Sequence, residues 1–379
     1  MIDFALTDEQ LMLRRMAHDF AEKEIVPVAE ELDREAKFPH EIIAKAREVG
    51  LININIPEEY GGLGASVLEE CLIAEEISWA CSGVGTALMI NNLAAVPIKL
   101  VGTEEQKKEW LSRMVEGELA SYAVTEPNAG SDVAAMEAFA EKRGNEYVLN
   151  GSKTFISNAS EASFFVVFAR TDREDRYKGI SCFIVERDRE GFSVSKKFDK
   201  LGQRCADTAE ISLEDVVIPE ENRLGPEGSG FLTAMRVFDI SRPTVSAAAV
   251  GVARRAMEEA LRYSQERVAF SQPIVRFQAV GHMLADMAIN IEAARLLAWK
   301  AAWNVDRGQP DTRAAAFAKA FAADMAMKAC VDAVQIFGGY GYMKEYPVEK
   351  LMRDVKVFQI YEGTSQIQRN IIVRELTRG

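Results

Sequence analysis

The chain has 379 residues with 45 Lys+Arg against 58 Asp+Glu, and its formal net charge of −13 argues against general affinity for nucleic acids. A hydrophobic share of 48% and a charged share of 27% are typical of folded domains, and the length predicts two or three of them. The five cysteines form no CxxC pair and the three histidines lack metal-ligand spacing, which argues against disulfides and zinc and for a reducing compartment.

The N-terminus, MIDFALTDEQ, places Asp3 and Asp8 where an export signal has positive and then apolar residues, so we expect a cytoplasmic protein. The uncharged segment 77–98 is about as long as a membrane span. We nevertheless expect a buried helical segment near an apolar cavity, because polar residues, glycines and a proline interrupt it: Gly83, Gly85, Asn91, Asn92 and Pro97.

Residues 1–120 have mostly helical periodicity. Thr7 with Gln10 has capping-box spacing, and Thr103 offers an N-cap for a helix at about 104–114. The same periodicity predicts helices near 41–49 and 68–77. The segment PEEYGGLG that lies between them is a turn, since no Lys-Ser/Thr follows it as in a phosphate loop.

From 121 to 228 the apolar pattern becomes strand-like, in short Val-, Ile- and Phe-rich runs separated by turn residues. No helix-length segment separates most of these runs, so we expect a compact antiparallel barrel or sandwich rather than parallel βαβ units. Helical periodicity returns in 229–379, where a long amphipathic helix around 283–298, a break at 306–310 and a second helix at about 313–337 predict an antiparallel bundle.

Neither GxGxxG nor a P-loop occurs, so the usual sequence grounds for nicotinamide or nucleotide triphosphate chemistry are missing. The turn YAVTEPNAGSD (122–132) carries hydroxyls and consecutive N–H groups that suit a polar heteroaromatic or a phosphate. Such a cluster taken alone is more often only a loop.

A second cluster lies at YEGTSQIQR (361–369). Ser365 with Gln368 has capping-box spacing, which places Glu362 and Gly363 just before a helix N-terminus. A carboxylate beside a glycine there suits a base aimed into a cavity, although acidic residues also favour helix N-termini for dipole reasons alone.

Taken together, seven segments resemble acyl-CoA dehydrogenases in composition and order, most closely the medium- and short-chain straight-chain enzymes. They are YAVTEPNAGSD (122–132), NGSKTFISNA (150–159), KLGQRCADTAEI (200–211), FDISRP (238–243), ERVAFSQPIVRFQAV (266–280), VQIFGGYGYMKEYPVEKLMRD (334–354) and IYEGTSQIQR (360–369). The resemblance implies an α+β multidomain fold with an N-terminal α-helical domain (1–120), a central antiparallel β-barrel domain (121–228) and a C-terminal four-helix bundle (229–379).

The resemblance also implies a homotetramer that binds FAD between the β domain and the bundle. It assigns flavin contacts within one subunit to Tyr122, Val124, Thr125, Gly130, Ser131, Phe155, Ile156 and Ser157. It assigns contacts from the adjacent subunit to Arg267, Phe270, Gln278, Gln335, Gly338 and Gly339, of which the last three meet the adenosine pyrophosphate. Thr364 and Gln366 complete the implied cofactor site.

For the substrate, the resemblance implies an acyl-CoA thioester converted to its trans-2-enoyl product. Glu362 is the implied base for the α-proton, flavin N5 accepts the β-hydride, and the electrons pass to an electron-transfer flavoprotein. Some relatives place the base near FDISRP, but that stretch has no Glu here, which favours Glu362. The implied substrate contacts are Ser131, Asp239, Arg242, Gly363, Thr86 and Met89.

Two alternatives stay open, an acyl-CoA oxidase that uses dioxygen and a flavin-free helical scaffold.

Two departures from the family pattern also stand out. Asn128 replaces a commoner glycine, so we expect a backbone conformation there that Asn tolerates, such as the left-handed region. Phe155 replaces a frequent tryptophan and lacks the indole N–H, so flavin spectral or redox properties are expected to shift.

Overall fold

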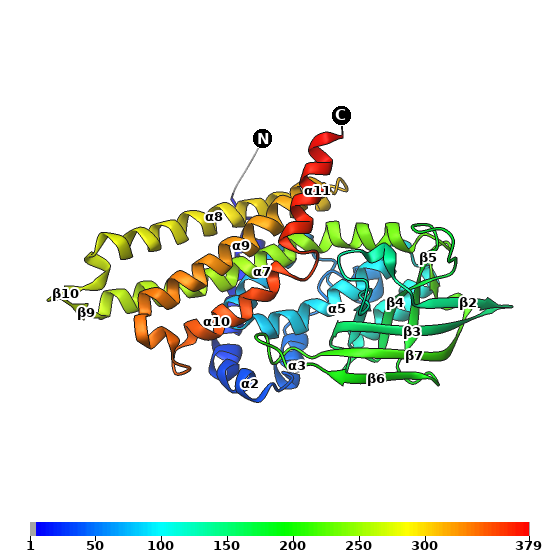
Figure 1. Cartoon of the computed structure of the whole chain (residues 1–379). Helices are drawn as coiled ribbons and strands as arrows, with labels where there is room; N and C mark the ends of the chain where they lie inside the picture. The colour runs from blue at the N-terminus through cyan, green and yellow to red at the C-terminus, as the bar shows by residue number, and fades with distance from the viewer. Residues whose placement is uncertain (1–4, 379) are drawn as a thin grey trace.

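The computed structural model describes residues 5–378, so Asp3 and the first residues used to argue against an export signal lie outside the described residues. Figure 1 shows the strands of the central part of the chain gathered at one end of an elongated molecule, while the long C-terminal helices and the short hairpin between two of them extend toward the other end. The five cysteines are buried and free.

The N-terminal part is helical, as predicted. Its helices are α1 (Asp8–Phe20), α2 (Ala29–Glu35), α3 (His40–Glu48), α4 (Val67–Ala80), α5 (Ser82–Val101) and α6 (Glu104–Glu116). Both expected N-caps are confirmed, since Thr7 and Thr103 each form a complete capping box with the glutamine three residues on. A third box, Ser66 with Glu69, starts α4. Reciprocal side-chain bonds at these ends satisfy N–H groups that a helix leaves unpaired.

The uncharged segment forms the end of α4 and most of α5, with a break at Cys81. Within residues 5–378, α5 is the one helix that is long and apolar enough to cross a membrane, and 61% of its most apolar window is buried inside the protein. Its Ala94, Ala95 and Ile98 pack against the β domain. α5 is therefore a largely buried core helix, as the sequence indicates.

The central part forms one mostly antiparallel sheet of eight strands. They are β1 (Ala120–Ala123), β2 (Phe139–Arg143), β3 (Glu146–Ser157), β4 (Phe164–Arg170), β5 (Ile180–Glu186), β6 (Phe192–Lys197), β7 (Thr208–Pro219) and β8 (Arg223–Leu224). The strand order is β6-β7-β3-β2-β4-β5-β8, and β1 pairs with β4. The β1–β4 pair and the single β2–β4 contact at Phe139 and Arg170 are parallel, a departure from the expected antiparallel pattern.

β4 is buried on both of its faces. Phe165 and Val167 point into a core shared with β3, β5 and β7, whereas Phe164, Val166 and Phe168 pack against α5 and α6. This alternation follows from the period of two along a strand. β1 ends close to the C-terminal part of the chain, because the ring of its buried Tyr122 lies 6.1 Å from that of Phe238.

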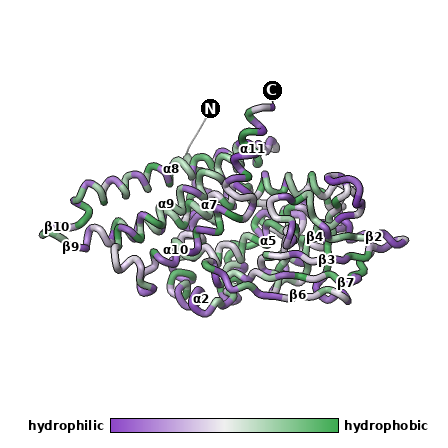
Figure 2. The backbone as a smooth tube through the Cα atoms, viewed as in Figure 1, coloured by the Kyte–Doolittle hydropathy of each residue, from purple (hydrophilic) through white to green (hydrophobic). Residues whose placement is uncertain are grey.

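The C-terminal part contains the long helices α7 (Gly230–Glu266), α8 (Gln278–Asp306) and α9 (Thr312–Phe337), followed by α10 (Pro347–Val355) and α11 (Ser365–Thr377). The short hairpin β9 (Val268–Ala269) and β10 (Gln272–Pro273) joins α7 to α8. Figure 2 shows hydrophilic and hydrophobic residues alternating along α8 and α9, as the sequence predicts for amphipathic helices. The break predicted between these two helices is confirmed, and Asp311 caps the second.

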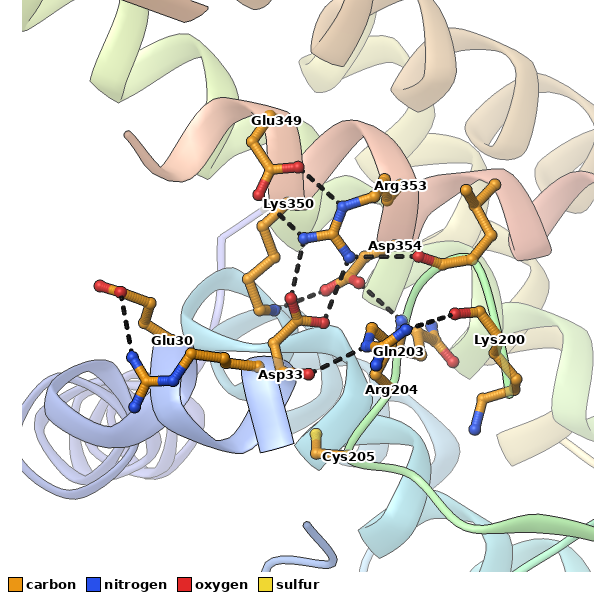
Figure 3. Close-up of polar contacts among 12 residues, drawn as sticks. Glu30, Asp33, Lys200, Gln203, Arg204, Cys205, Glu349, Lys350, Arg353 and Asp354 are labelled. Atoms are coloured by element: carbon orange, nitrogen blue, oxygen red, sulfur yellow. Dashed lines mark hydrogen bonds and ion pairs between the residues drawn. The ribbon is translucent and has the colours of Figure 1, made fainter. Parts of the chain in front are cut away.

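A polar cluster joins the N-terminal helices, the β domain and the bundle (Figure 3). Arg353 of α10 donates to Asp33 of α2, with 2.8 Å between Nη2 and Oδ2. The next residue, Asp354, accepts from the Gln203 N–H at 2.6 Å and from the Lys350 ammonium at 2.6 Å. We call this set the Asp33–Asp354 cluster. It fixes the loop that carries Gln203 against two helices from different parts of the chain.

Asp354 is 1% exposed, so its charge is compensated only by this cluster. We predict that Asp354→Asn, which keeps the shape of the side chain, lowers the free energy of unfolding by about 3–5 kcal/mol, because the buried Lys350 ammonium loses its carboxylate. Chemical denaturation of the holoprotein measures this. Lys328→Ala, which removes an exposed ion pair with Asp332, is the control and should cost no more than ~1 kcal/mol. Equal stability of the two variants contradicts the assignment.

Candidate active site

Glu362 lies on a sharp turn immediately before α11. Its φ is +55°, and that of Gly363 is +88°, so two consecutive residues adopt left-handed backbone. For a non-glycine residue this conformation costs on the order of 1–3 kcal/mol and persists only where the surroundings hold it. Glycine at 363 is required sterically as well, since a Cβ there would lie 2.6 Å from Gln368 Nε2.

Three buried donors hold the two carbonyls of this turn. Lys319 Nζ donates to the Gly363 oxygen at 2.5 Å. Gln368 Nε2 donates to both oxygens, at 3.1 Å to Glu362 and 3.0 Å to Gly363, and Arg242 Nε reaches the Glu362 oxygen at 3.3 Å. Lys319 is 1% exposed, Arg242 4% and Gln368 0%. The turn is therefore fixed by side chains from α7, α9 and α11 together.

The carboxylate of Glu362 accepts a hydrogen bond from Ser241 Oγ at 2.6 Å. Burial raises the pKa of Glu362, and the Ser241 hydrogen bond with the nearby charges of Arg242 and Lys319 opposes this rise. Burial also lowers the pKa of Lys319 to about 7, against the attraction of Glu362. The charge of Lys319 lowers the pKa of Glu362, and the charge of Glu362 raises that of Lys319, so the protonation of each depends on the other.

Glu362 lines a cavity of about 60 Å³ between α5 and α7. The structure thus brings the predicted base together with two predicted substrate contacts, Thr86 and Met89, on one pocket wall. The remaining lining near the base is largely apolar, with Ile90, Leu93, Val96, Ile240 and Val245. A carboxylate with a raised pKa beside an apolar pocket is suited to removing a proton from a carbon acid held in that pocket.

One wall of the pocket is tied to the Asp33–Asp354 cluster. Thr86 Oγ1 donates to Gln203 Oε1 at 2.9 Å, while the Gln203 N–H donates to Asp354. Tyr361 Oη and Gln203 Nε2 are buried there without a hydrogen-bond partner. The residue next to the base is therefore packed against a wall that the cluster holds in place.

The sequence analysis did not identify Ser241, Lys319, Gln203 or Tyr361 as functional. Three of them lie within segments that it quoted, FDISRP, KLGQRCADTAEI and IYEGTSQIQR, but their side chains had no assigned role. Lys319 carried a usable signal, because it is a single charge in the alanine-rich run AAAFAKAFAA. A lysine that interrupts the apolar face of a helix indicates a buried partner.

The first predicted group of flavin contacts lies at the end of β1 and in β3. Tyr122, Val124 and Ile156 are buried, Thr125 and Ser157 are half-buried, and Gly130 and Ser131 are exposed. Phe155 is 63% exposed with φ +57°, so left-handed backbone turns its ring outward beside Phe198. The Tyr122 hydroxyl is buried and unpartnered, and no atom lies within 4 Å of a Cβ built at Gly130. An outward aromatic ring beside open backbone fits a flat polar heteroaromatic ligand.

The second predicted group lies far from the first within one chain. Arg267, Gly338 and Gly339 line an open groove of about 480 Å³ with Tyr263 and Phe337. The β9–β10 hairpin beside this groove is at the opposite end of the molecule from the β domain (Figure 1). All six residues of the group are exposed, and Phe270 is 91% exposed. One chain alone does not bring the two groups together.

Asp239 and Arg242, predicted to hold CoA, pair with each other at 3.2 Å beneath the Glu362 turn. Asp239 also accepts from Thr312 Oγ1 at 2.6 Å. Since Arg242 is buried and bonds to the Glu362 carbonyl, its visible role is to support the turn, and its contact with CoA stays a prediction.

One local prediction is wrong, and the left-handed example suggested for Asn128 is not adopted. Asn128 is not among the residues with positive φ, so the TEPNAGSD turn closes without left-handed backbone there, through the Glu126–Ala129 bridge. Thr364, not Ser365, is the N-cap of α11, because its side chain accepts from the Ile367 N–H. Ser365 instead donates to Asp324 at 2.8 Å, and Gln366 is exposed on the first turn.

Comparisons with known proteins agree with this architecture. Residues 7–118, 121–216 and 228–377 match the N-terminal, middle and C-terminal domains of acyl-CoA dehydrogenases. A short-chain-specific acyl-CoA dehydrogenase of Clostridium acetobutylicum is 45% identical over 100% of both chains. Within residues 5–378, no group of three or more His, Cys, Asp or Glu side chains is placed to hold a metal ion.

Solved structures give the same result. Butyryl-CoA dehydrogenase from Megasphaera elsdenii superposes with a TM-score of 0.97 at 42% identity, covering 100% of both chains. A chain from a structure described as the electron transferring flavoprotein of Acidaminococcus fermentans has a TM-score of 0.98 at 46% identity, again over 100% of both chains. PigA with FAD and proline is 30% identical over 100% of both chains with a TM-score of 0.96. The chain belongs to the acyl-CoA dehydrogenase family.

Proposed function

We propose that this protein is an FAD-dependent acyl-CoA dehydrogenase that converts a saturated acyl-CoA to its trans-2-enoyl product. The observation that carries the proposal is the Glu362 carboxylate, which lies at an apolar pocket on a turn fixed by three buried donors. Family membership and the similarity to a short-chain-specific acyl-CoA dehydrogenase support a thioester substrate.

In this proposal Glu362 removes the α-proton of the thioester. Burial raises the pKa of its carboxyl and so makes the ionised form a stronger base, while Ser241 orients the carboxylate through its hydrogen bond. The Glu362 N–H makes no hydrogen bond within the described residues and is free to donate to the thioester oxygen, where negative charge develops. FAD, when bound, supplies the acceptor for the β-hydride.

The cofactor site is proposed to form between subunits of a cytoplasmic homotetramer. Tyr122, Thr125, Ser131 and Phe155 would meet the flavin in one subunit. Arg267 and the glycines at 338 and 339 of a second subunit would hold the pyrophosphate, since Arg is a bidentate partner for phosphate and glycine lets backbone approach closely. Exposure of this second group in the single chain is consistent with such a shared site.

We propose an electron-transfer flavoprotein as the electron acceptor, because a chain 46% identical to this one occurs in the structure described for such a protein. The alternative acceptor, dioxygen, would make the protein an oxidase.

Anaerobic reduction by butyryl-CoA followed by reoxidation with air or with electron-transfer flavoprotein separates the two. A purified protein that gains no flavin absorbance after incubation with FAD would instead favour the flavin-free scaffold.

Glu362→Gln tests the catalytic assignment. The amide cannot accept the α-proton, so we predict a loss of at least ~10³ in the rate of flavin bleaching by substrate, while FAD content and CoA-ester affinity stay near those of the parent protein. Stopped-flow absorbance under anaerobic conditions measures the rate. Bleaching at a near-normal rate removes Glu362 from the mechanism.

Ser241→Ala tests the environment of the base. Ser241 donates to the ionised carboxylate and lowers its pKa, so losing this bond raises the pKa of Glu362 further. The ionised base then appears only at higher pH, and we predict that the acidic limb of the bleaching rate moves up by about one to two pH units. Ser246→Ala is the matched control, because Ser246 Oγ donates to the Arg242 carbonyl and not to Glu362. The prediction is contradicted if the acidic limb of the pH–rate profile lies at the same pH in Ser241→Ala, Ser246→Ala and the parent protein.

A further inference from the structure

The acyl pocket ends in polar side chains. Glu70, Asn92 and Thr244 line the pocket that contains Glu362, and they also line a second cavity of about 20 Å³ whose other walls are mostly apolar. These three residues and Met89 therefore form the partition between the two spaces, and we call the three polar residues the pocket floor. Glu362, Tyr361 and Ser241 line only the first space, on its other side.

The floor lies close to the base. Thr244 is three residues after Ser241 on α7, so it is on the same face and about 4.5 Å further along the helix axis. Asn92 reaches the same place from α5, and Glu70 from α4. An acyl chain whose α-carbon is at Glu362 therefore meets the floor after only a few carbon atoms.

The floor has hydrogen-bonding capacity that the protein does not use. Thr244 is 6% exposed, and its Oγ1 makes no hydrogen bond of normal geometry, although its interaction with the Glu70 carboxyl lowers the pKa of Glu70. Asn92 Oδ1 is buried and unpartnered. A buried polar atom without a partner costs about 1–3 kcal/mol. The methyl end of an alkyl chain would leave Thr244 Oγ1 and Asn92 Oδ1 without a partner. An O–H group at the same place can donate a hydrogen bond to either of them.

The floor favours a neutral group over a charged one. Burial raises the pKa of Glu70 and lowers that of Lys99, which lies near it and donates to the Asn55 oxygen at 2.9 Å. The Glu70–Lys99 pair has no net charge whichever residue holds the proton. A second carboxylate or an ammonium at the floor would be desolvated without an opposite charge to compensate it.

We propose that the preferred substrate is a short-chain acyl-CoA with a neutral hydrogen-bond donor, such as a hydroxyl group, at the end of its acyl chain, and that Thr244 and Asn92 accept from that donor. This inference rests on the proposed function. It assigns the floor the role of selecting the terminal group, a role separate from the chemistry at Glu362.

Paired CoA esters of equal chain size test the proposal: 4-hydroxybutyryl against pentanoyl, and 5-hydroxypentanoyl against hexanoyl. Dissociation constants come from calorimetry on the unreactive Glu362→Gln holoprotein, and bleaching rates come from the parent holoprotein. In at least one pair we expect the hydroxy ester to bind about tenfold tighter or more, because one satisfied hydrogen bond contributes at about that level.

Thr244→Val, which replaces only the hydroxyl, and Asn92→Leu should each reduce this preference, and the double variant should favour the alkyl ester. Thr233→Val is the matched control, because Thr233 is a buried threonine of α7 whose hydroxyl bonds to the Ser229 carbonyl and does not line the pocket. Flavin content of each variant verifies that it folds. Retention of the full preference in the double variant overturns the assignment to these two residues.

Alkyl esters that bind as tightly as their hydroxy partners in both pairs overturn the inference, since water then satisfies the floor. Tighter binding of glutaryl-CoA or 4-aminobutyryl-CoA overturns it as well, in favour of a charged terminal group. These failures differ from a failure of the proposed function. If alkyl esters bleach the flavin without any preference for the hydroxyl, only the inference fails. If no ester of either series bleaches it, the dehydrogenase assignment fails.

Discussion

The site depends on holding a carboxylate on left-handed backbone beside an apolar pocket. Glu362 would relax from this conformation if its carbonyl were free, because the conformation is costly for a residue with a Cβ. Lys319, Arg242 and Gln368 remove that freedom by donating to the carbonyls of Glu362 and Gly363. Three helices far apart in the sequence must pack correctly before these donors meet the turn. The position of the base is therefore a property of the whole bundle.

Two of these donors, Arg242 and Lys319, are cations, although neutral donors would be enough to hold the two carbonyls of the turn. A buried cation costs desolvation energy, and apolar replacements of buried ion pairs are often as stable or more so. Arg242 and Lys319 also add positive charge near a carboxylate whose pKa burial raises, so they limit that rise. The same side chains thus set both where the carboxylate lies and how strongly it holds its proton. This double role accounts for the presence of two charged side chains in buried helices that are otherwise rich in alanine.

Local features of the fold are predictable from the sequence, and long-range contacts are not. The capping boxes at Thr7 and Thr103 are correct because both partners lie within four residues. Glu362 is found because a short motif surrounds it. Lys319 is 43 positions before Glu362 and meets the turn only through the packing of α9 against α11, which no periodicity reveals. The error at Ser365 has the same origin, since its hydroxyl is taken by Asp324 of α9.

The pocket is lined by elements from different parts of the chain, and each part is held in place by different contacts. Its wall at Thr86 is held through Gln203 to the Asp33–Asp354 cluster, which also fixes α10 and the N-terminal helices. Its base is held by the bundle, and its floor is made where α4, α5 and α7 meet. Changes at the floor leave the donors to the Glu362 turn in place, because none of the three floor residues bonds to that turn. In the proposed function, the architecture therefore allows the terminal group of the substrate to be selected independently of the proton transfer at Glu362.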